Sequence, residues 1–466
     1  MKKLHIFSLL FVSALAFTAC VNEEDDLFSA SAAARLAAAE SRYTEILTAS
    51  PGGWTMEYYP TNDTLGFKAK GYLMLADFEK DGTVRVGMWN AFSGNWYKED
   101  TSLWDIITDN GPVLSFNTYN KCLHAFSDPH DLPASIQGVS GDDKEDVTGL
   151  GAEGDYEFVL TDVKANSDII TVKGKKRGSY VRMVKIPEGT NYETYFLALK
   201  TFEALYFPSD AINDTYLTVG GRKYVLSGIS TGIASLYPAD GDPITDTKNY
   251  AFVISRINDK TTIRFRKPIV EGDASVQELA LNTETYTMDD TEGGDAVLAG
   301  PNPNEFFAQK LTGEDALSCY VDRNTEHMSS DYATIYNDLV TALANSSNKY
   351  TINDMVFTKD GEGTVKFTIN LQYRKGGRTN KVNLDYRFGM AVTENDVTLT
   401  YQEPLNTAAE NIASSTPAVP ALLNKLSGKF NARGNLTPFV LNEMRMVSAA
   451  DTKSYFRVYY NVKSMN

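Results

Sequence analysis

Cysteine, tryptophan and histidine are scarce in this chain of 466 residues, which has three, four and four of them. So few cysteines do not form a disulfide framework, and the sequence leaves open whether Cys122 and Cys319 pair or are buried separately. The apolar run from Ile6 to Phe17 is too short to span a bilayer, which takes roughly 20 residues. Positive charge is in deficit, and a net charge of −16 argues against nucleic acid and anionic membrane surfaces as partners.

The N-terminus carries the pattern of a signal peptide. Lys2 and Lys3 precede the apolar run, and Phe17-Thr18-Ala19-Cys20 follows it with small residues just ahead of a cysteine. This arrangement resembles a bacterial lipoprotein signal, which implies cleavage of residues 1–19 and attachment of acyl chains such as palmitate at Cys20. An ordinary secretory signal that ends there is the alternative. Acyl chains hold a protein to a membrane without a spanning helix, because each buried methylene contributes about 0.8 kcal/mol.

An acidic segment, Val21-Asn22-Glu23-Glu24-Asp25-Asp26, follows within a tether expected over residues 20–30. An acidic run beside a lipidated cysteine resembles the export signal of Bacteroides-type lipoproteins that are flipped to the cell surface. It implies an outer-membrane lipoprotein that faces the extracellular side. A solvated, self-repelling tether on a periplasm-facing protein is the alternative. Asp63-Thr64-Leu65 also fits the short pattern that such bacteria O-glycosylate.

Helical periodicity marks a few segments of a chain that otherwise has the pattern of strands. Apolar residues recur at helical spacing over 32–48, 192–206 and 331–344, and Ser415-Thr416-Pro417 has the capping residues of a fourth, shorter helix. Elsewhere apolar and polar residues alternate, which indicates strands with one buried face. The sequence therefore predicts an α+β fold of predominantly antiparallel β-sheets with three or four amphipathic helices.

Hairpins and repeated units organise the predicted strands. The clearest alternation runs over 365–373 and resumes over 382–388 after a Gly-Gly turn, and further hairpins are predicted around Asp81-Gly82 and Asn258-Asp259. A helix followed by a meander recurs, which predicts an N-terminal unit over 31–190, a middle unit over 191–327 and a C-terminal unit over 328–466. The sequence leaves open whether these units are separate domains or one continuous sheet.

Three short segments carry a resemblance to a known family. They are Gly52-Gly53-Trp54-Thr55-Met56-Glu57-Tyr58-Tyr59-Pro60, Asp109-Asn110-Gly111-Pro112-Val113-Leu114-Ser115-Phe116 and Gly154-Asp155-Tyr156-Glu157-Phe158-Val159. Together they resemble a family of Bacteroides-type lipoproteins defined only as a domain of unknown function, most densely before residue 190. Such proteins are often encoded beside SusC/SusD-type uptake systems and secreted peptidases. The resemblance implies a setting in nutrient capture and supplies no catalytic residues.

Two motifs associated with catalysis or cofactor binding occur without the context that they need. Gly228-Ile229-Ser230-Thr231-Gly232 matches the nucleophile elbow of hydrolases, which requires a helix after it, whereas a strand is predicted over 233–237. Gly149-Leu150-Gly151-Ala152-Glu153-Gly154 matches a dinucleotide-binding loop, which must open a helix, but a strand is predicted over 156–160. Both are interpreted as ordinary turns, and no cofactor is expected.

Residues of metal-ligand type gather in one region of the sequence. The first group comprises His124, Asp128, His130 and Asp131. The second comprises Asp142, Asp143, Glu145 and Asp146. The first group lacks the H-E-x-x-H helix of many zinc sites, and the second lacks the glycine spacing of an EF-hand loop. An acidic surface loop is the interpretation adopted, and no metal site is predicted.

An aromatic cluster is the most suggestive feature for ligand binding. It consists of Trp89, Phe92, Trp96, Tyr97 and Trp104. Aromatic faces beside amide side chains suit sugars, whose C–H faces stack on rings while their hydroxyls bond to amides. Core packing explains aromatic residues as well, because they dominate core energetics. Packing is favoured for Trp89 and Trp104, whereas polar neighbours leave Trp96 and Tyr97 balanced between the two roles. All four stay candidate ligand-binding residues.

The predicted function is that of a non-catalytic binding or accessory component of nutrient uptake. Its partners would be the outer membrane, a glycan or peptide ligand and a SusC/SusD-type transporter. Two other classes stay open. A carboxylate-dependent hydrolase would use a pair of acidic residues, but the separation of such a pair is a structural quantity. A structural or adhesive cell-surface component would use apolar helix faces for assembly.

Overall fold

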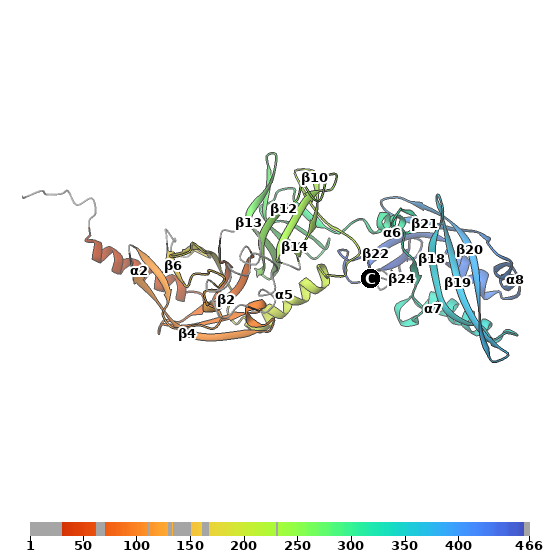
Figure 1. Ribbon diagram of the computed structural model, residues 1–466, viewed down its shortest axis with the longest axis horizontal. Coiled ribbons are helices and arrows are strands. Elements are labelled where there is room, and N and C mark those ends of the chain that lie inside the picture. The colour runs from red at the N-terminus through yellow and green to blue at the C-terminus, as the bar shows by residue number, and fades with distance from the viewer. Residues whose placement is uncertain are drawn as a thin grey trace, which may run out of the picture.

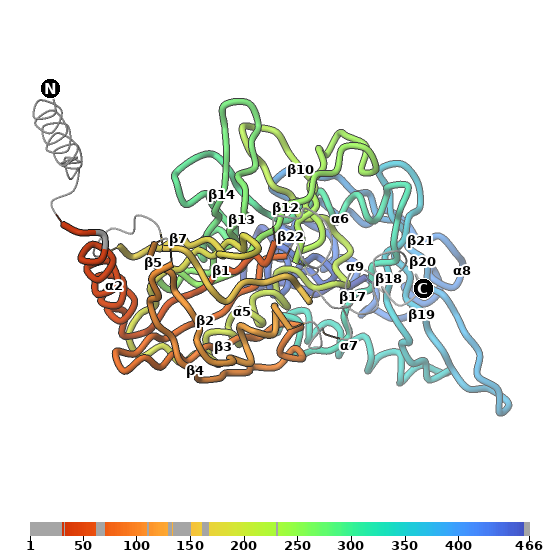
Figure 2. The backbone as a smooth tube through the Cα atoms, turned by 60° about the vertical axis from the view of Figure 1, so that its left-hand side comes forward, coloured from red at the N-terminus to blue at the C-terminus, as the bar shows by residue number. Residues whose placement is uncertain are grey.

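Strands dominate this computed structural model, which describes residues 30–61, 70–109, 111–128, 133, 151–160, 167–229 and 232–460. Of these described residues, 21% are helical and 44% lie in strands. Within these ranges 24 strands form three closed barrels of eight strands each, with antiparallel neighbours. The barrels follow one another along the long axis of the molecule (Figure 1), and a view turned by 60° shows the same succession (Figure 2).

The prediction of an α+β fold is wrong, because the protein is mostly β and its strands close into barrels, with six α-helices in the part of the chain that the structure describes. Alternation of apolar and polar residues shows that a strand has one buried and one solvent-exposed face. The strands of an open sheet and those of a barrel share this pattern, so it does not distinguish the two folds. Closure depends on the pairing of the first strand with the last. In the N-terminal barrel it joins Trp54 to Lys185, which are too distant in sequence for a local pattern to reveal.

Barrel 1 is packed with side chains and closed by a helix. Its strands are β1 (Trp54–Tyr59), β2 (Tyr72–Phe78), β3 (Thr83–Met88), β4 (Lys98–Thr108), β5 (Pro112–Phe116), β6 (Glu157–Leu160), β7 (Ile169–Gly174) and β8 (Tyr180–Lys185). Helix α2 (Ala32–Thr48) begins where the Ser31 hydroxyl accepts the Ala34 N–H. It lies against β2, β4 and β5, and its Tyr43, Ile46 and Leu47 join the core of the barrel.

Barrel 2 shares a hydrophobic core with the helix that precedes it. Its strands are β9 (Thr215–Val219), β10 (Arg222–Ser227), β11 (Ile233–Pro238), β12 (Lys248–Ile257), β13 (Lys260–Glu271), β14 (Ala274–Asn282), β15 (Thr287–Asp290) and β16 (Val297–Ala299). Helix α5 (Tyr192–Tyr206) is capped by Asn191 and contacts β3 of barrel 1 and β12 of barrel 2. Its apolar face packs into the core of barrel 2, so one helix contacts both barrels.

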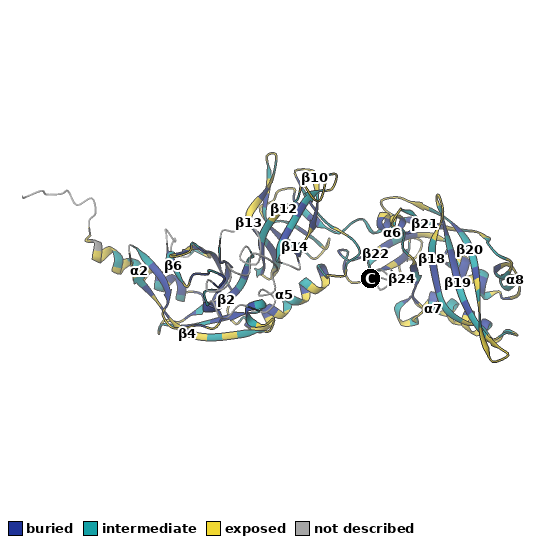
Figure 3. Cartoon of the chain, in the orientation of Figure 1, coloured by how far each residue is buried: buried dark blue, intermediate teal, exposed yellow. Residues whose placement is uncertain are grey.

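Barrel 3 carries the other four helices. Its strands are β17 (Cys319–Val321), β18 (Thr351–Gly361), β19 (Thr364–Lys375), β20 (Arg378–Val392), β21 (Val397–Pro404), β22 (Gly428–Gly434), β23 (Glu443–Ser448) and β24 (Tyr455–Tyr460). The helices are α6 (Pro303–Thr312), α7 (Ser330–Ala344), α8 (Thr407–Ser415) and α9 (Ala418–Lys425). Buried residues alternate with more exposed ones along many strands (Figure 3), as on β7 and β24, which is the pattern of a strand with one face inside a barrel.

Two asparagines join barrel 3 to the segment before barrel 2. The Asn213 side chain donates to Phe439 O at 2.8 Å and accepts the Leu441 N–H at 2.8 Å. Asn442 reciprocates, since its Oδ1 accepts the Ile212 N–H at 2.9 Å. The Phe439 ring packs edge-on against Tyr206 of α5 at 5.0 Å. Backbone and core contacts therefore fix barrel 3 against α5.

Individual elements predicted from the sequence are confirmed where periodicity was strong. Helices over 32–48 and 192–206 match α2 and α5, and α7 begins one residue before the predicted 331–344. The fourth helix corresponds to α9, whereas α6 and α8 were not predicted. The β19–β20 hairpin pairs Val365 with Phe388, and Phe252 pairs with Phe265 around Asn258-Asp259.

Candidate functional site

Trp96 lies on a tight turn between β3 and β4 and is 74% exposed. The turn contains a short 3-10 helix, η2 (Ala91–Ser93), followed by Gly94 and Asn95 at φ values of 73° and 61°. Such positive φ angles suit glycine and asparagine, and they reverse the chain just before Trp96. The indole therefore projects from a defined reversal of the backbone.

Hydrogen bonds and one buried ring fix the conformation of this turn. The Asn90 side chain accepts the Phe92 N–H at 2.9 Å, and Ser93 Oγ accepts the Asn90 N–H at 3.0 Å and donates to Trp96 O at 2.7 Å. Phe92 is buried and its ring lies 4.3 Å from that of Phe126 in the core of barrel 1. Trp96 is thus presented by a turn that is anchored in the barrel.

The other three predicted ligand-binding aromatics do not form a platform with Trp96. Tyr97 packs toward α5, with its ring 6.1 Å from Phe196, and its hydroxyl donates to Glu99 Oε2 at 2.6 Å. Trp89 is half-buried and its indole N–H donates to Asn95 O at 2.8 Å, inside the turn. Trp104 is buried in the core, 5.0 Å from Phe78. Of these four predicted residues, Trp96 alone has a mostly exposed ring.

The residues weighed as metal ligands are only partly placed. His130, Asp131 and the group over 142–146 lie outside the described residues. His124 is sandwiched between Tyr119 at 5.1 Å and Tyr156 at 4.6 Å, and its Nδ1 accepts the Asn120 N–H. Burial lowers the pKa of His124, so the ring is neutral at pH 7. Among the described residues no three His, Cys, Asp or Glu side chains are grouped so that they could hold a metal ion.

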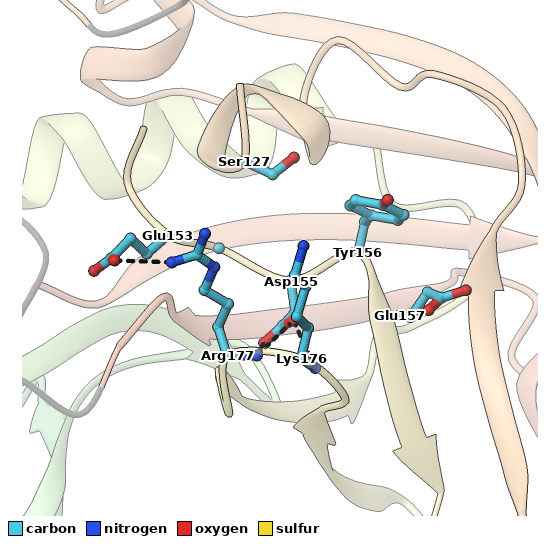
Figure 4. A pocket seen from close by; sticks show the side chains of 8 residues that line it. Ser127, Glu153, Asp155, Tyr156, Glu157, Lys176 and Arg177 are labelled. Atoms are coloured by element: carbon cyan, nitrogen blue, oxygen red, sulfur yellow. Dashed lines mark hydrogen bonds and ion pairs between the residues drawn. The ribbon is translucent and has the colours of Figure 1, made fainter. Parts of the chain in front are cut away.

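A small pocket of about 230 Å³ opens at one end of barrel 1, beside the β7–β8 turn (Figure 4). Sequence reasoning did not propose the residues that line it as a site, although Asp155 and Tyr156 belong to a segment that carries the family resemblance. They include Ser127, Glu153, Asp155, Tyr156, Lys176 and Arg177. The side chains of Glu153 and Arg177 form an ion pair of 2.9 Å at its edge (Figure 4). Three acidic and two basic residues line the pocket, which therefore has no strong preference for a charged ligand.

Asp155 in this pocket supports the backbone. Its carboxylate accepts the N–H groups of Lys176, Arg177 and Ser179 at 3.0 to 3.1 Å. A Cβ atom on Gly174 would lie 1.9 Å from Asp155 Oδ2, so the strand approaches the carboxylate as only glycine allows. A carboxylate bound to three amides is fixed in place, and it shapes the β7–β8 turn.

The hydrolase-type and nucleotide-type motifs gain no support from the structure. Gly228 and Gly232 have φ values of 78° and 83°, and strand β11 begins at Ile233, where a nucleophile elbow would need a helix. Ser230 and Thr231 lie outside the described residues, as do Gly149 and Leu150 of the other motif and the Asp63-Thr64-Leu65 pattern. Strand β6 follows that second motif.

The two described cysteines are buried and unpaired with each other. Burial raises the pKa of the Cys122 thiol to about 12 and that of Cys319 further. Both thiols are therefore protonated and unreactive at neutral pH. Cys20 lies outside the described residues, and its acylation stays a prediction. None of the helices in the described ranges combines the length and apolarity that crossing a membrane requires.

Four charged residues between barrels 1 and 2 were missed by sequence reasoning. Glu57 and Arg182 lie opposite each other on β1 and β8, and Arg264 and Glu278 lie opposite each other on β13 and β14. The guanidinium of Arg182 is 2.8 Å from Glu57, and that of Arg264 is 3.2 Å from Glu278. The four side chains are only 1% to 17% exposed although they lie on outward strand faces, where alternation alone predicts a solvated residue.

Comparisons with known proteins define a family and little else. The profile of DUF4302, a domain of unknown function, matches residues 24–283. No curated protein matches the chain. Among solved structures, the isotype 1 transferrin binding protein B from serogroup B Neisseria meningitidis is similar at 8% identity and a TM-score of 0.13, over 88% of this chain and 76% of that one.

Proposed function

This chain belongs to the DUF4302 family, whose function is unknown, and we propose that it is an outer-membrane lipoprotein that captures a glycan or peptide ligand for a nutrient-uptake system. The observation that carries the proposal is the presentation of Trp96. A large indole is held open to solvent by a turn whose hydrogen bonds and buried Phe92 keep it in place. Fixed aromatic side chains supply contact area at low entropic cost, and they dominate binding energies in many interfaces.

The proposed anchor is Cys20, with the acidic tether between the lipid and the first barrel. Helix α2 lies at one end of the long axis and barrel 3 at the other (Figure 1). An N-terminal lipid would therefore hold the α2 end near the membrane and extend barrels 2 and 3 away from it. Such an arrangement suits a protein that meets its ligand outside the membrane and passes it to a SusC/SusD-type transporter.

The acidic groups of the pocket in barrel 1 do not favour hydrolysis as a second function. Asp155 is bound to three backbone amides, and Glu153 pairs with Arg177. Glu157 pairs with Lys175 at 3.2 Å. A general acid and a nucleophile need carboxylates that face each other across a substrate, and these three carboxylates are committed to other partners.

Ligand capture is tested by Trp96→Ala in the full-length mature protein, screened on glycan and peptide arrays. Loss of the ring is expected to weaken binding by about 30-fold, the effect of a 2 kcal/mol hot spot. Leu436→Ala is the matched control, because Leu436 is also 74% exposed but lies in barrel 3. Both variants should melt at the temperature of the parent protein. Equal binding by parent and Trp96→Ala, or the lack of any array ligand for the parent, would refute the proposal.

Anchoring and partnership are tested separately. Cys20→Ala is expected to abolish incorporation of labelled palmitate and to release the protein from the outer membrane, and antibodies against barrel 3 should label intact cells. Affinity capture of the lipidated protein from mildly solubilised membranes should recover a SusC/SusD-type transporter. Retention of Cys20→Ala in the membrane would contradict the lipid anchor, and capture of no transporter beside a working control bait would contradict the role in uptake.

A further inference from the structure

Barrel 2 is closed at one end and open at the other. Helix α5 covers the end where β12 turns into β13, and there the Tyr195 hydroxyl donates to Arg256 O at 3.0 Å. At the opposite end, where β10 and β12 begin and β11 and β13 finish, a pocket of about 380 Å³ opens into the barrel. Mouths of β-barrels are a recurrent place for small ligands, and this volume lies at the lower end of the usual range.

Aromatic and aliphatic side chains form the wall and floor of this mouth. Tyr224 of β10 lies opposite Pro238 of β11, and both belong to the pocket lining. Tyr250 of β12 lines it too, with its ring edge-on to the buried Phe265 at 6.2 Å. The floor is made by the buried Leu236 and Ile269. Two half-buried tyrosine rings thus border an apolar cup that a flat, partly apolar ligand would fill.

Polar groups at the mouth have balanced charge. The Tyr224 hydroxyl donates a short hydrogen bond to Glu271, and Arg222 lies 3.6 Å from the same carboxylate. Asp246 and Lys248 add one charge of each sign on the rim. Burial and the bond to Glu271 raise the pKa of Tyr224 to about 12, so its hydroxyl stays protonated at neutral pH. Two cations against two anions select for a neutral ligand with hydroxyl or amide groups.

The rim loop over 239–247 is ordered before any ligand arrives. The Gly241 N–H donates to Pro238 O at 2.8 Å, and the Asp246 N–H donates to Asp242 O at 2.9 Å. The Asp246 carboxylate in turn accepts the Asp242 N–H at 2.9 Å. A loop held by its own hydrogen bonds loses little entropy when a ligand binds, which favours a preformed site.

We propose that the open mouth of barrel 2 binds a single neutral pyranose ring, the terminal or free unit of a glycan. The C–H face of the sugar stacks on Tyr224 and Tyr250, and its hydroxyls bond to Glu271, Arg222 and the rim. This site lies in a different barrel from the Trp96 turn, so sugar binding here does not depend on whether that turn binds a ligand.

The probes are neutral methyl glycosides of glucose, galactose, mannose and N-acetylglucosamine at millimolar concentration, with methyl glucuronide and glucosamine as charged comparisons. Saturation-transfer NMR on the full-length mature protein should show transfer to ring protons of at least one neutral glycoside. Tyr250→Ala and Glu271→Gln should each weaken that binding by about tenfold or more. Tyr224→Phe keeps the ring and removes only the hydroxyl, which serves as a milder variant if Tyr250→Ala unfolds the barrel.

Ile244→Ala is the matched control, because Ile244 is 89% exposed on the same rim loop and does not line the pocket. Trp96→Ala is the second control and should bind the glycoside like the parent protein. The proposal is overturned if no neutral glycoside shows transfer, if only the charged sugars do, or if binding survives both Glu271→Gln and Tyr224→Phe. Loss of binding in Trp96→Ala alone would assign the sugar to barrel 1 and would likewise overturn it.

Discussion

The carboxylate of Glu57 and the guanidinium of Arg182 lie 2.8 Å apart in the contact between barrels 1 and 2, with side chains only 1% and 8% exposed. A second pair, Arg264 and Glu278, faces them from barrel 2. Arg182 is 3.5 Å from Glu278, and Arg264 is 3.9 Å from Glu57, so each charge has an opposite charge on both barrels. Moving one barrel relative to the other by the width of a strand would separate Arg182 from Glu278 and Arg264 from Glu57. These four residues, the Glu57 cluster, therefore help to determine how the two barrels dock.

Removal of Arg182 should therefore destabilise the protein. Arg182→Met leaves the Glu57 carboxylate buried with Arg264 at 3.9 Å as its nearest cation. We expect a loss of about 3–5 kcal/mol in the free energy of unfolding at pH 8. Urea denaturation followed by tryptophan fluorescence measures it. Arg177→Met is the matched control, because its ion pair with Glu153 is partly exposed and is worth less than about 1 kcal/mol. Equal effects of the two substitutions would contradict the role of burial.

The stability of this contact should depend on pH in a defined direction. Burial raises the pKa of Glu57 to about 7, against the opposing pull of Arg182 and Arg264. Between about pH 4.5 and 7 the folded protein then holds a proton that the unfolded chain has released, so this group makes the folded state less stable as pH rises. Glu57→Gln removes the titration. The stability of the parent relative to Glu57→Gln should fall by about 2–3 kcal/mol from pH 5 to pH 8.

That comparison isolates Glu57 from other groups that titrate in the same window. His124, whose pKa burial lowers, contributes the opposite trend, but it is present in both proteins and its effect cancels in the difference. Unfolding free energies at half-unit pH steps provide the curve. A difference that grows with pH would show that the two arginines outweigh burial and hold the pKa of Glu57 below its ordinary value.

A third prediction concerns Asp155, whose carboxylate holds the N–H groups of the β7–β8 turn. Asp155→Ala should lower the free energy of unfolding by about 2 kcal/mol. Three amides lose a charged acceptor, but water can replace it in part as their hydrogen-bond partner. Hydrogen exchange should quicken at Lys176, Arg177 and Ser179 and stay slow in β1. Asp168→Ala is the control, since the Asp168 side chain is 81% exposed and pairs with Lys185 at 3.2 Å. Unchanged exchange at the three amides would contradict the structural role.

The local elements of this fold could be read from the sequence, but their assembly could not. The alternation over 365–373 and 382–388 predicts β19 and β20 because each side chain reports its own face of the sheet. Closure pairs β1 with β8 across more than a hundred residues, and no local pattern encodes it. The class was therefore misjudged while single hairpins were identified correctly.

The same distinction applies to the candidate sites. Trp96 could be singled out because polar neighbours and a Gly-Asn pair surround it, and both are local signals. Tyr224, Tyr250 and Glu271 come together only through the barrel, since they belong to three strands. The Glu57 cluster forms only when two barrels dock. From the sequence alone, a charged residue at an outward strand position is expected to be solvated, and nothing local indicates its burial.

The last prediction separates two tryptophans that the sequence placed in one cluster. Trp104 is 5% exposed, packs on Phe78 and donates its indole N–H to Glu79 O at 3.2 Å. Trp104→Ala should lower the free energy of unfolding by about 3–5 kcal/mol, because it leaves a cavity in the core. Trp104→Phe should lower it less, because a ring remains. Trp96→Ala should leave the melting temperature nearly unchanged, because the indole is 74% exposed and buries little surface in the folded protein. Thermal unfolding of the three variants measures this, and a stable Trp104→Ala would contradict its place in the core of barrel 1.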